Sequence, residues 1–262
     1  MADFFQVKTY LNYWLDSVNE HSLHSPFLYD LYTKVINVQP TPDLEIEKLR
    51  FDLLKTHREI KVQDLGAKSK HFETSTRKIS EIAETSSSNI RFSSLYQRLA
   101  EYAEARTVVE LGTSFGLNTL YLAKKRGVKV YTFEGSESIA EVAEDTFRFS
   151  GTTNIELIKG NINSTLYSTL SRIPKVDFAF IDANHQYEAT IKYFEELLMK
   201  VQHKSIMVID DIHGNPGMNK AWKEICKHDL VHTTLDLYRC GILFFDPSLT
   251  KQHVVLQFNV LD

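Results

Sequence analysis

From residue 107 onward, short apolar segments alternate with longer amphipathic ones. The apolar segments have the length and β-branched content of strands, and they span 107–111, 129–133, 155–158, 176–181 and 205–209. The segments between them have helical periodicity and span 117–125, 138–149, 164–170 and 187–201. This alternation predicts an α/β fold, in which right-handed crossovers join parallel strands into a doubly wound sheet.

The two ends of the chain depart from this alternation. Residues 231–238, 241–245 and 254–258 have strand character with no helix between them, which predicts antiparallel pairing at one edge of the sheet. The first 60 residues have helical periodicity, and Ser25 and Pro26 form a cap and first turn for one helix. Residues 61–92 are mixed, and Ser93 is a candidate cap for the next helix. We therefore expect a mainly helical accessory or lid region over 1–92 and a main domain over 93–262.

Composition excludes several classes of protein. The 262 residues are 43% hydrophobic with a net charge of −4 and no basic run, so a nucleic-acid partner is not expected. The two cysteines form no CxxC pair, and neither a signal peptide nor a membrane-spanning apolar stretch is visible. These features predict a cytoplasmic protein.

A glycine-containing loop joins the first predicted strand to its helix. Glu110 ends the strand, and Gly112 and Gly116 follow before the helix begins near Leu117. Glu110 occupies the first glycine position of a GxGxxG dinucleotide fingerprint, where a carboxylate would repel a pyrophosphate. S-adenosylmethionine has no phosphate and carries two cationic groups, so the loop favours this methyl donor over NAD. The alternative is an ordinary turn without a ligand. The segment 64–67 has a similar acid-x-glycine pattern, but it lacks the second glycine and belongs to the accessory region.

A second acid follows the next predicted strand. Glu134 ends that strand, and a carboxylate at this place matches the vicinal diol of a ribose. The alternative for Glu134 is a solvated acid at a strand end. The following strand ends near Asn161, which is a candidate for the adenine edge or part of a plain turn.

Acidic residues gather where the fourth and fifth strands end. Asp182 follows one strand, and Asp210 and Asp211 follow the other. Repulsion between these carboxylates should raise at least one pKa unless a cation neutralises them. Three interpretations stay open: a divalent ion such as Mg²⁺ held by the acids, a metal-free general base provided by an aspartate or His213, and an ordinary helix cap with a solvent-facing acid.

These motifs resemble the class I S-adenosylmethionine-dependent methyltransferases, and within them the catechol O-methyltransferase-like branch and a bacterial subgroup. The resemblance covers about residues 93–260. It lies in Glu110-Leu-Gly-Thr-Ser-x-Gly, Glu134, Ile181-Asp182-x-x-His185 and Ile209-Asp210-Asp211. It implies a Rossmann-like seven-stranded sheet in the order 3-2-1-4-5-7-6, with strand 7 antiparallel.

The resemblance also implies roles for individual residues. Cofactor-binding positions would be Glu110, Gly112, Thr113, Ser114, Gly116, Asn118, Glu134, Gly135, Asn161 and Asp182. Catalytic positions would be Asp182, Asp210 and His213, and metal ligands would be Asp182, Asp210 and Asp211, with Asp211 in place of the family's asparagine. The lysine that the metal-dependent enzymes carry shortly after the fourth strand is absent, because residues 184–186 are Asn-His-Gln.

The sequence thus predicts an enzyme that transfers a methyl group from S-adenosylmethionine, most simply to an oxygen of a small molecule. Such an enzyme would mainly align and desolvate the reactants, because the methyl donor is intrinsically activated. A noncatalytic S-adenosylmethionine-binding protein and a nicotinamide-dependent dehydrogenase are the alternatives. Aromatic residues of the N-terminal helices either line a pocket or pack in the core, and a homodimer is left open.

Overall fold

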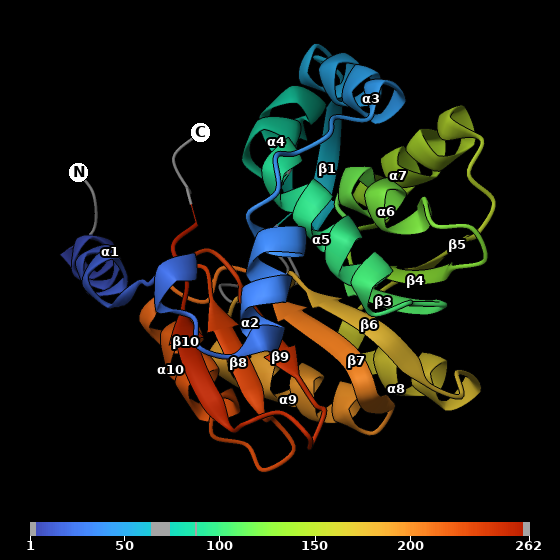
Figure 1. The fold of residues 1–262 in the computed structure, drawn as a ribbon. Helices are drawn as coiled ribbons and strands as arrows, with labels where there is room; N and C mark the ends of the chain where they lie inside the picture. Colours follow the sequence, from blue (N-terminus) through green and yellow to red (C-terminus); the bar gives the residue numbers. More distant parts are fainter. Residues whose placement is uncertain (1–3, 64–73, 87, 259–262) are drawn as a thin grey trace. The chain divides into compact units, whose positions relative to one another are not determined.

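The computed structural model describes residues 4–63, 74–86 and 88–258, and it has an α/β fold (Figure 1). The chain divides into two compact units. Unit 1 contains residues 1–38 and 175–262, and unit 2 contains residues 39–174. The segment 64–67, assigned above to the accessory region, lies outside the described residues.

Unit 2 contains three parallel strands in the order β3-β4-β5. They are β3 (Thr107–Leu111), β4 (Lys129–Glu134) and β5 (Ile155–Lys159). The helices that follow them are α6 (Leu117–Ala123), α7 (Glu137–Ser150) and α8 (Ile162–Arg172). Val108, Val109 and Leu111 of β3 are fully buried, as expected for a strand covered on both faces. The predicted strand–helix alternation is confirmed here, with strand order 1-2-3.

The first part of unit 2 combines helices, which the sequence predicted, with a hairpin that it did not predict. Its helices are α3 (Leu44–Leu54), α4 (Ile79–Ser86) and α5 (Ile90–Tyr102), and β1 (Glu59–Gln63) pairs antiparallel with β2 (Thr74–Lys78). Only Ile60 and Val62 of β1 are buried, which is too short an alternation to recognise as a strand. Ser93 was wrongly predicted as a cap. Asn89 caps α5 by accepting a hydrogen bond from the Phe92 N–H at 3.1 Å, and Ser93 lies within the helix.

Unit 1 contains five strands in the order β10-β8-β9-β7-β6. They are β6 (Val176–Ile181), β7 (Val201–Ile209), β8 (Thr233–Asp236), β9 (Gly241–Phe244) and β10 (Gln252–Val255). β6 and β7 are parallel, and β9 is antiparallel to both β7 and β8. This confirms the predicted order 4-5-7-6 and the antiparallel strand 7.

The last strand corrects two predictions. β10 is one strand more than the seven expected, and it pairs parallel, not antiparallel, with β8. The reason is that β7 and β8 occupy both edges of β9. A further strand must therefore pair with the outer edge of β8, and its direction, opposite to that of β9, makes it parallel to β8.

Unit 1 also contains several helices, two of which contact opposite faces of β9. They are α1 (Phe4–Asp16), the 3₁₀ turn η1 (Glu20–Ser22), α2 (Pro26–Leu31) with its π-helical continuation η2 (Tyr32–Ile36), α9 (Tyr187–Leu198) and α10 (Pro216–Ile225). Phe27 of α2 contacts Phe244 edge to face at 5.3 Å, while the Trp222 ring of α10 lies over Gly241. These two positions of β9 are three residues apart, so they face opposite sides of the strand.

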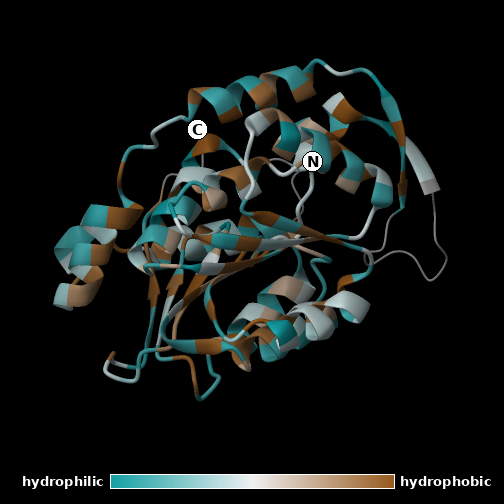
Figure 2. Ribbon diagram, turned by 90° about the vertical axis from the view of Figure 1, so that its right-hand side faces the viewer, coloured by the Kyte–Doolittle hydropathy of each residue, from teal (hydrophilic) through white to brown (hydrophobic). Residues whose placement is uncertain are grey.

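The ends of several helices follow from their caps. Ser25 accepts from the Leu28 N–H and Pro26 begins α2, as the sequence predicted. The sequence analysis missed α10, although Asn215 caps it by accepting from the Met218 N–H at 3.0 Å and Pro216 opens its first turn. In Figure 2 hydrophobic residues lie along many of the strands, whereas the helices alternate hydrophobic and hydrophilic residues.

The N-terminal 92 residues are shared between the units, with 1–38 in unit 1 and 39–92 in unit 2. Residue Val18 forms an isolated parallel bridge with Leu256, and its N–H donates to the Val255 carbonyl at 3.0 Å. The hydroxyls of Tyr13 and Tyr32 donate to the carbonyls of Leu256 and Gln257. The first and last segments of unit 1 are therefore bound to each other. The functional division predicted at residue 92 stays a prediction.

Candidate functional site

The loop between β3 and α6 is held by its backbone against the end of β4. The N–H groups of Gly112 and Thr113 both donate to the Phe133 carbonyl, at 3.1 and 3.0 Å. Three loop residues have positive φ: Gly112 (102°), Ser114 (49°) and Gly116 (80°). For Ser114, which has a side chain, this conformation is uncommon, and such strain tends to occur at functional sites.

Gly116 allows a close contact between two helices. A Cβ at this position would lie 2.3 Å from Cε1 of Phe147 on α7. From the sequence, this glycine was predicted to let its helix pack on the strand. The structure instead places the tight contact against α7, a helix that follows the next strand.

Glu110 is completely buried at the end of β3. Its carboxylate accepts hydrogen bonds from the hydroxyls of Thr119 (2.5 Å) and Thr132 (2.6 Å) and from Nδ2 of Asn118 (2.9 Å). Burial raises the pKa of Glu110 to about 7, and the nearby Glu134 also acts to raise it. The three hydrogen bonds act to lower it. A buried carboxylate with such a pKa would be stabilised in its charged form by a cationic ligand.

The side chain of Asn118 presents a hydrogen-bond acceptor without a partner. Its Nδ2 donates to Glu110, and its buried Oδ1 accepts no hydrogen bond from the residues that the structure describes. A buried polar atom in this state usually indicates a missing ligand or water. Together, Asn118 and Glu110 present acceptors only, which fits a cationic or N–H-bearing group.

Glu134 lies half-buried at the end of β4 and is oriented by backbone N–H groups. Its Oε2 accepts from the Ser114 N–H and its Oε1 accepts from the Ser136 N–H, both at 2.9 Å, and the Gly135 N–H also donates to it. Burial raises the pKa of Glu134, while these backbone donors lower it. The carboxylate is thus fixed in one orientation against the glycine loop, with lone pairs left for further donors such as hydroxyls.

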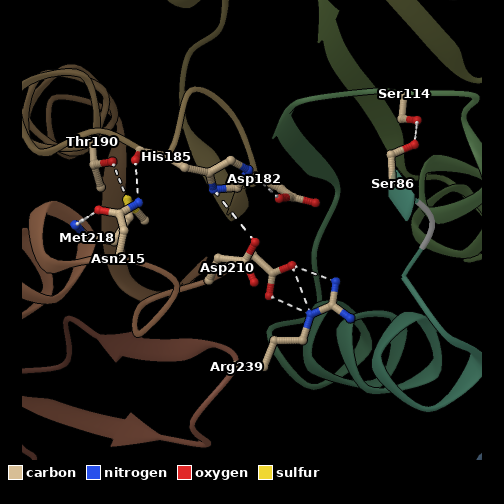
Figure 3. A network of polar contacts seen from close by, with 10 residues as sticks. Ser86, Ser114, Asp182, His185, Thr190, Asp210, Asn215, Met218 and Arg239 are labelled. Atoms are coloured by element: carbon tan, nitrogen blue, oxygen red, sulfur yellow. Dashed lines mark hydrogen bonds and ion pairs between the residues drawn. The ribbon is translucent and has the colours of Figure 1, made fainter. Parts of the chain in front are cut away.

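Two further residues of unit 2 bear on the predicted cofactor site. The hydroxyl of Ser86, at the end of α4, lies 2.8 Å from the hydroxyl of Ser114 (Figure 3). Asn161 is the N-cap of α8, and its side chain accepts from the Asn163 N–H at 2.9 Å. Its contact with an adenine edge stays a prediction, because the structure already uses the side chain as a cap.

In unit 1, Asp210 forms an ion pair that the sequence did not predict. Its carboxylate is fully buried, and Arg239 donates to it through Nε at 3.3 and 3.2 Å and through Nη2 at 3.0 Å (Figure 3). The Asp210 N–H also donates to the Ile181 carbonyl at 2.9 Å. Arg239 therefore supplies the neutralising cation that the group of acids requires, at least for Asp210.

Asp182, His185 and Asp211 form a second cluster in unit 1. Their potential ligand atoms all lie within 4.8 Å of one another, with Nε2 of His185 3.6 Å from Asp182 and Nδ1 3.9 Å from Asp211. Burial and the neighbouring Asp210 raise the pKa of Asp211, while His185 and Arg239 act to lower it. The predicted metal set of Asp182, Asp210 and Asp211 stays a prediction, and the potential ligand atoms that converge here belong to Asp182, His185 and Asp211.

The backbone around this second cluster is strained. Asn184, His185 and Asp211 have φ values of 67°, 40° and 51°. Asn215 supports the turn by donating from Nδ2 to the His185 carbonyl at 2.9 Å (Figure 3). Non-glycine residues in this region of φ are uncommon, and their concentration beside convergent acids is typical of a functional site.

His213 has both ring nitrogens engaged inside unit 1. Nε2 lies 2.7 Å from Oδ2 of Asp236, Nδ1 lies 2.7 Å from Nδ2 of Asn219, and the ring stacks on Tyr238 at 5.4 Å. Asp236 and Asn219 are themselves buried. These contacts suit a residue that positions the turn after β8, and the predicted role of His213 as a base stays a prediction.

The sequence analysis missed Arg239, Asp236 and Ser86. Arg239 lies 29 residues from its partner Asp210, and no local motif connects the two. The one available signal was charge balance, because several converging carboxylates require a cation. Asp236 and Ser86 stand in ordinary strand-end and helix-end contexts and gave no signal.

Comparisons with known proteins add a family to this geometry. A family profile described as "Methyltransferase domain" matches residues 109–212, a range that contains the glycine loop, Glu134 and all three aspartates. Residues 109–212 are therefore similar to a methyltransferase domain. A segment of 123 residues is 32% identical to the catechol O-methyltransferase of Mycobacterium tuberculosis, covering 46% of this chain and 54% of that protein. The chain thus spans about half the length of the curated relative that it matches.

Several solved structures share the fold of most of this chain. An O-methyltransferase from Bacillus cereus in complex with SAH has a TM-score of 0.60 at 18% identity, covering 81% of this chain and 95% of that one. TomG, an O-methyltransferase from Streptomyces achromogenes in complex with SAM, has a TM-score of 0.57 at 19% identity, covering 82% and 95%. The SAH-bound methyltransferase PaMTH1 of Podospora anserina has a TM-score of 0.60 at 14% identity, covering 85% and 97%. At these identities the likeness shows a Rossmann-like α/β fold.

Among the described residues, no helix combines the length and apolar character that crossing a membrane would require.

Proposed function

We propose that this chain is an S-adenosylmethionine-dependent methyltransferase that methylates an oxygen of a small molecule. The observation that carries the proposal is the acceptor-only lining of the loop after β3. Glu110 and the unpartnered Oδ1 of Asn118 suit a cation, and Glu134 suits a diol. A dinucleotide pyrophosphate would instead meet a buried carboxylate at this loop, which argues against the dehydrogenase alternative.

The residues of unit 2 would bind and orient the methyl donor. When bound, S-adenosylmethionine supplies a methyl group already activated by its sulfonium. Glu134, fixed by the Ser114 and Ser136 N–H groups, would accept from the ribose hydroxyls. Glu110 and Asn118 would receive the methionine end, and charge on that ligand would favour the ionised form of Glu110. The likeness to the SAH- and SAM-bound structures supports this assignment.

The residues of unit 1 would prepare the acceptor. A hydroxyl acceptor must lose its proton to become a good nucleophile, and Asp182, His185 and Asp211 are the convergent basic groups available. Asp210 would act differently from the prediction, because Arg239 already holds its charge. We assign Asp210, Arg239 and His213 to positioning the ends of β7 and β8.

A divalent cation fits Asp182, His185 and Asp211 but not Asp210. Two carboxylates and one imidazole offer three ligand atoms within 4.8 Å of one another, whereas the Asp210 carboxylate faces a guanidinium. An imidazole ligand favours ions such as Mn²⁺ or Zn²⁺ over Mg²⁺, which prefers oxygen ligands only. A bound ion would lower the pKa of an acceptor hydroxyl.

Calorimetric titration with S-adenosylmethionine tests the donor site. The wild type should bind it in preference to NAD, and Glu134→Gln should weaken binding about 10-fold to 100-fold, because charge-assisted hydrogen bonds to the diol are lost. Glu137→Gln, an exposed glutamate three residues further on, is the matched control and should bind as the wild type does. An absence of binding to the wild type would refute the proposal, and tighter binding of NAD would support a dehydrogenase.

Methyl transfer itself separates an enzyme from a noncatalytic binding protein. Incubation with labelled donor and a panel of phenols, catechols and amines should label an oxygen acceptor. Donor binding without transfer to any acceptor would favour the noncatalytic alternative. Label on amines alone would contradict the assignment to oxygen.

Metal dependence is tested independently of turnover. Titration with Mn²⁺ should raise the melting temperature of the wild type, and the shift should disappear in His185→Ala. Mg²⁺ should give a smaller shift. If chelator and added metal change neither stability nor activity, the acids act without an ion.

A further inference from the structure

The most hydrophobic face of α1 points away from the protein. Phe4 and Trp14 are 81% and 64% exposed, and Val7, Leu11 and Leu15 are exposed as well. These five side chains recur at positions 4, 7, 11, 14 and 15 and so form one stripe along the helix. Contiguous apolar surface of this kind on a soluble protein usually marks an interaction site.

The opposite face of α1 fixes the orientation of this stripe. Tyr13 is buried, and its hydroxyl donates to the Leu256 carbonyl at 2.7 Å and accepts from the Phe258 N–H at 3.0 Å. Tyr10 contacts Tyr238 edge to face at 5.1 Å. Since the tyrosine face is anchored within unit 1, rotation of α1 to bury the apolar stripe would break these contacts.

The spacing of the stripe is that of a helix–helix seam. Residues Phe4, Val7, Leu11 and Trp14 follow the 3-4-3 spacing of the a and d positions of a heptad. In an antiparallel pair of identical helices, Phe4 of one copy meets Trp14 of the other, and Val7 meets Leu11. The stripe is thus complementary to itself, as a two-fold symmetric interface requires.

The exposed area is sufficient for a dimer. Fully exposed aromatic side chains present about 150–250 Å² each, so Phe4 and Trp14 expose on the order of 300 Å² together. The three aliphatic side chains bring the total to roughly 600 Å² per chain, so two stripes would bury roughly 1,200 Å², at the lower end of specific interfaces.

Charge argues against a lipid surface as the occupant. Interfacial amphipathic helices carry lysine and arginine on their polar face, whereas α1 has Lys8 as its one basic residue and Asp16 as its one acidic residue. A second copy of the helix meets the stripe without electrostatic repulsion.

We propose that this chain forms a homodimer through the exposed stripe of α1, defined by Phe4, Val7, Leu11, Trp14 and Leu15. The proposal is independent of the methyltransferase activity, because it rests on the exposed face of α1 and its spacing alone.

Sedimentation equilibrium at low-micromolar to submillimolar concentrations tests the dimer. The average mass should rise from the monomer value of 30.2 kDa toward twice that value. The double variant Leu11→Glu/Trp14→Glu should stay at the monomer mass, because each symmetric contact would then bring like charges together. Since both side chains are exposed, its circular dichroism spectrum should match that of the wild type, which shows that the variant folds.

The matched control is Phe149→Glu, which changes an exposed aromatic residue (72%) on α7 in unit 2. It should dimerise as the wild type does. A monomeric wild type, or a dimer that persists in the Leu11→Glu/Trp14→Glu variant, would overturn the proposal. So would a monomer that partitions through α1 onto vesicles of anionic phospholipid.

Discussion

The guanidinium of Arg239 lies against the fully buried carboxylate of Asp210, with Nη2 3.0 Å from one oxygen and Nε within 3.3 Å of both. The contact joins the end of β7 to the turn between β8 and β9. Because the Ile212 N–H also donates to the Arg239 carbonyl at 3.1 Å, the two segments are connected through side chain and backbone. The charge of one acid in the proposed acceptor site is thus balanced by the protein itself.

Replacing Arg239 by alanine should destabilise the protein strongly. The change leaves the Asp210 carboxylate buried without its cation, for which a loss of about 3–5 kcal/mol in the free energy of unfolding is typical. Urea denaturation measures this loss. The double variant Arg239→Ala/Asp210→Asn should recover much of it, because the uncompensated charge is gone. Two single losses that simply add in the double variant would show that the pair is not coupled.

Glu110→Gln should stabilise the ligand-free protein in a pH-dependent way. The folded pKa of Glu110 is raised from 4.5 to about 7, so the wild type is most stable below the unfolded value and loses stability as pH rises through this window. The advantage of the glutamine variant should therefore grow between pH 4.5 and about 7 and reach up to about 3 kcal/mol above it.

Melting temperatures over a pH series measure this difference. Glu137→Gln, at an exposed position, should give a difference from the wild type that does not change over the same window. A flat profile for Glu110→Gln would mean that Glu110 ionises normally when buried. The same variant should lose affinity for S-adenosylmethionine, so stability and function would conflict at this position.

Gly116→Ala should destabilise unit 2. A Cβ would meet the Phe147 ring at 2.3 Å, and a φ of +80° is unfavourable for alanine. Together these effects should lower the free energy of unfolding by about 2–4 kcal/mol. Gly151→Ala is the matched control, because Gly151 has a φ of +68° but no atom within 4 Å of its Cβ position. Chemical denaturation should show a smaller loss for Gly151→Ala, and equal losses would remove Phe147 from the explanation.

His213→Gln separates positioning from base catalysis. Since both ring nitrogens are engaged with Asp236 and Asn219, the variant should lower the melting temperature and change kcat by less than about tenfold, with an unchanged pH profile. Asp236→Asn should lower the melting temperature similarly. A drop in kcat of more than about a hundredfold at an unchanged melting temperature would restore His213 as the general base.

Sequence reasoning located the elements of the fold because each had a local pattern. Each of the strands β3 to β7 contains a short, largely apolar segment, and Ser25 with Pro26 marks the start of α2. The short hairpin of β1 and β2 had only Ile60 and Val62 as a buried pattern, and α10 was overlooked between two strand-like regions. The direction of β10 depended on which edges of the sheet were already occupied, and a local pattern does not contain that information.

The residues of the candidate site likewise fall into those that a local sequence pattern identified and those that it did not. The glycines and Glu134 were recognisable because a loop between strand and helix places them predictably. The partner of Asp210 was not, because Arg239 approaches from a turn that only tertiary structure brings near. His185 was noticed in the sequence, yet its place beside Asp182 and Asp211 depends on strained turns with positive φ.

The hydrogen bonds between the first and last segments of unit 1 affect how the chain can fold during synthesis on the ribosome. Unit 2 is one continuous segment, and all its residues are synthesised before the second part of unit 1. By contrast, the hydrogen bonds of Val18, Tyr13 and Tyr32 described above are made with backbone groups of residues 255–258, which are synthesised much later. The nascent N-terminal helices should therefore remain unpaired, and accessible to chaperones, until the last strand leaves the exit tunnel.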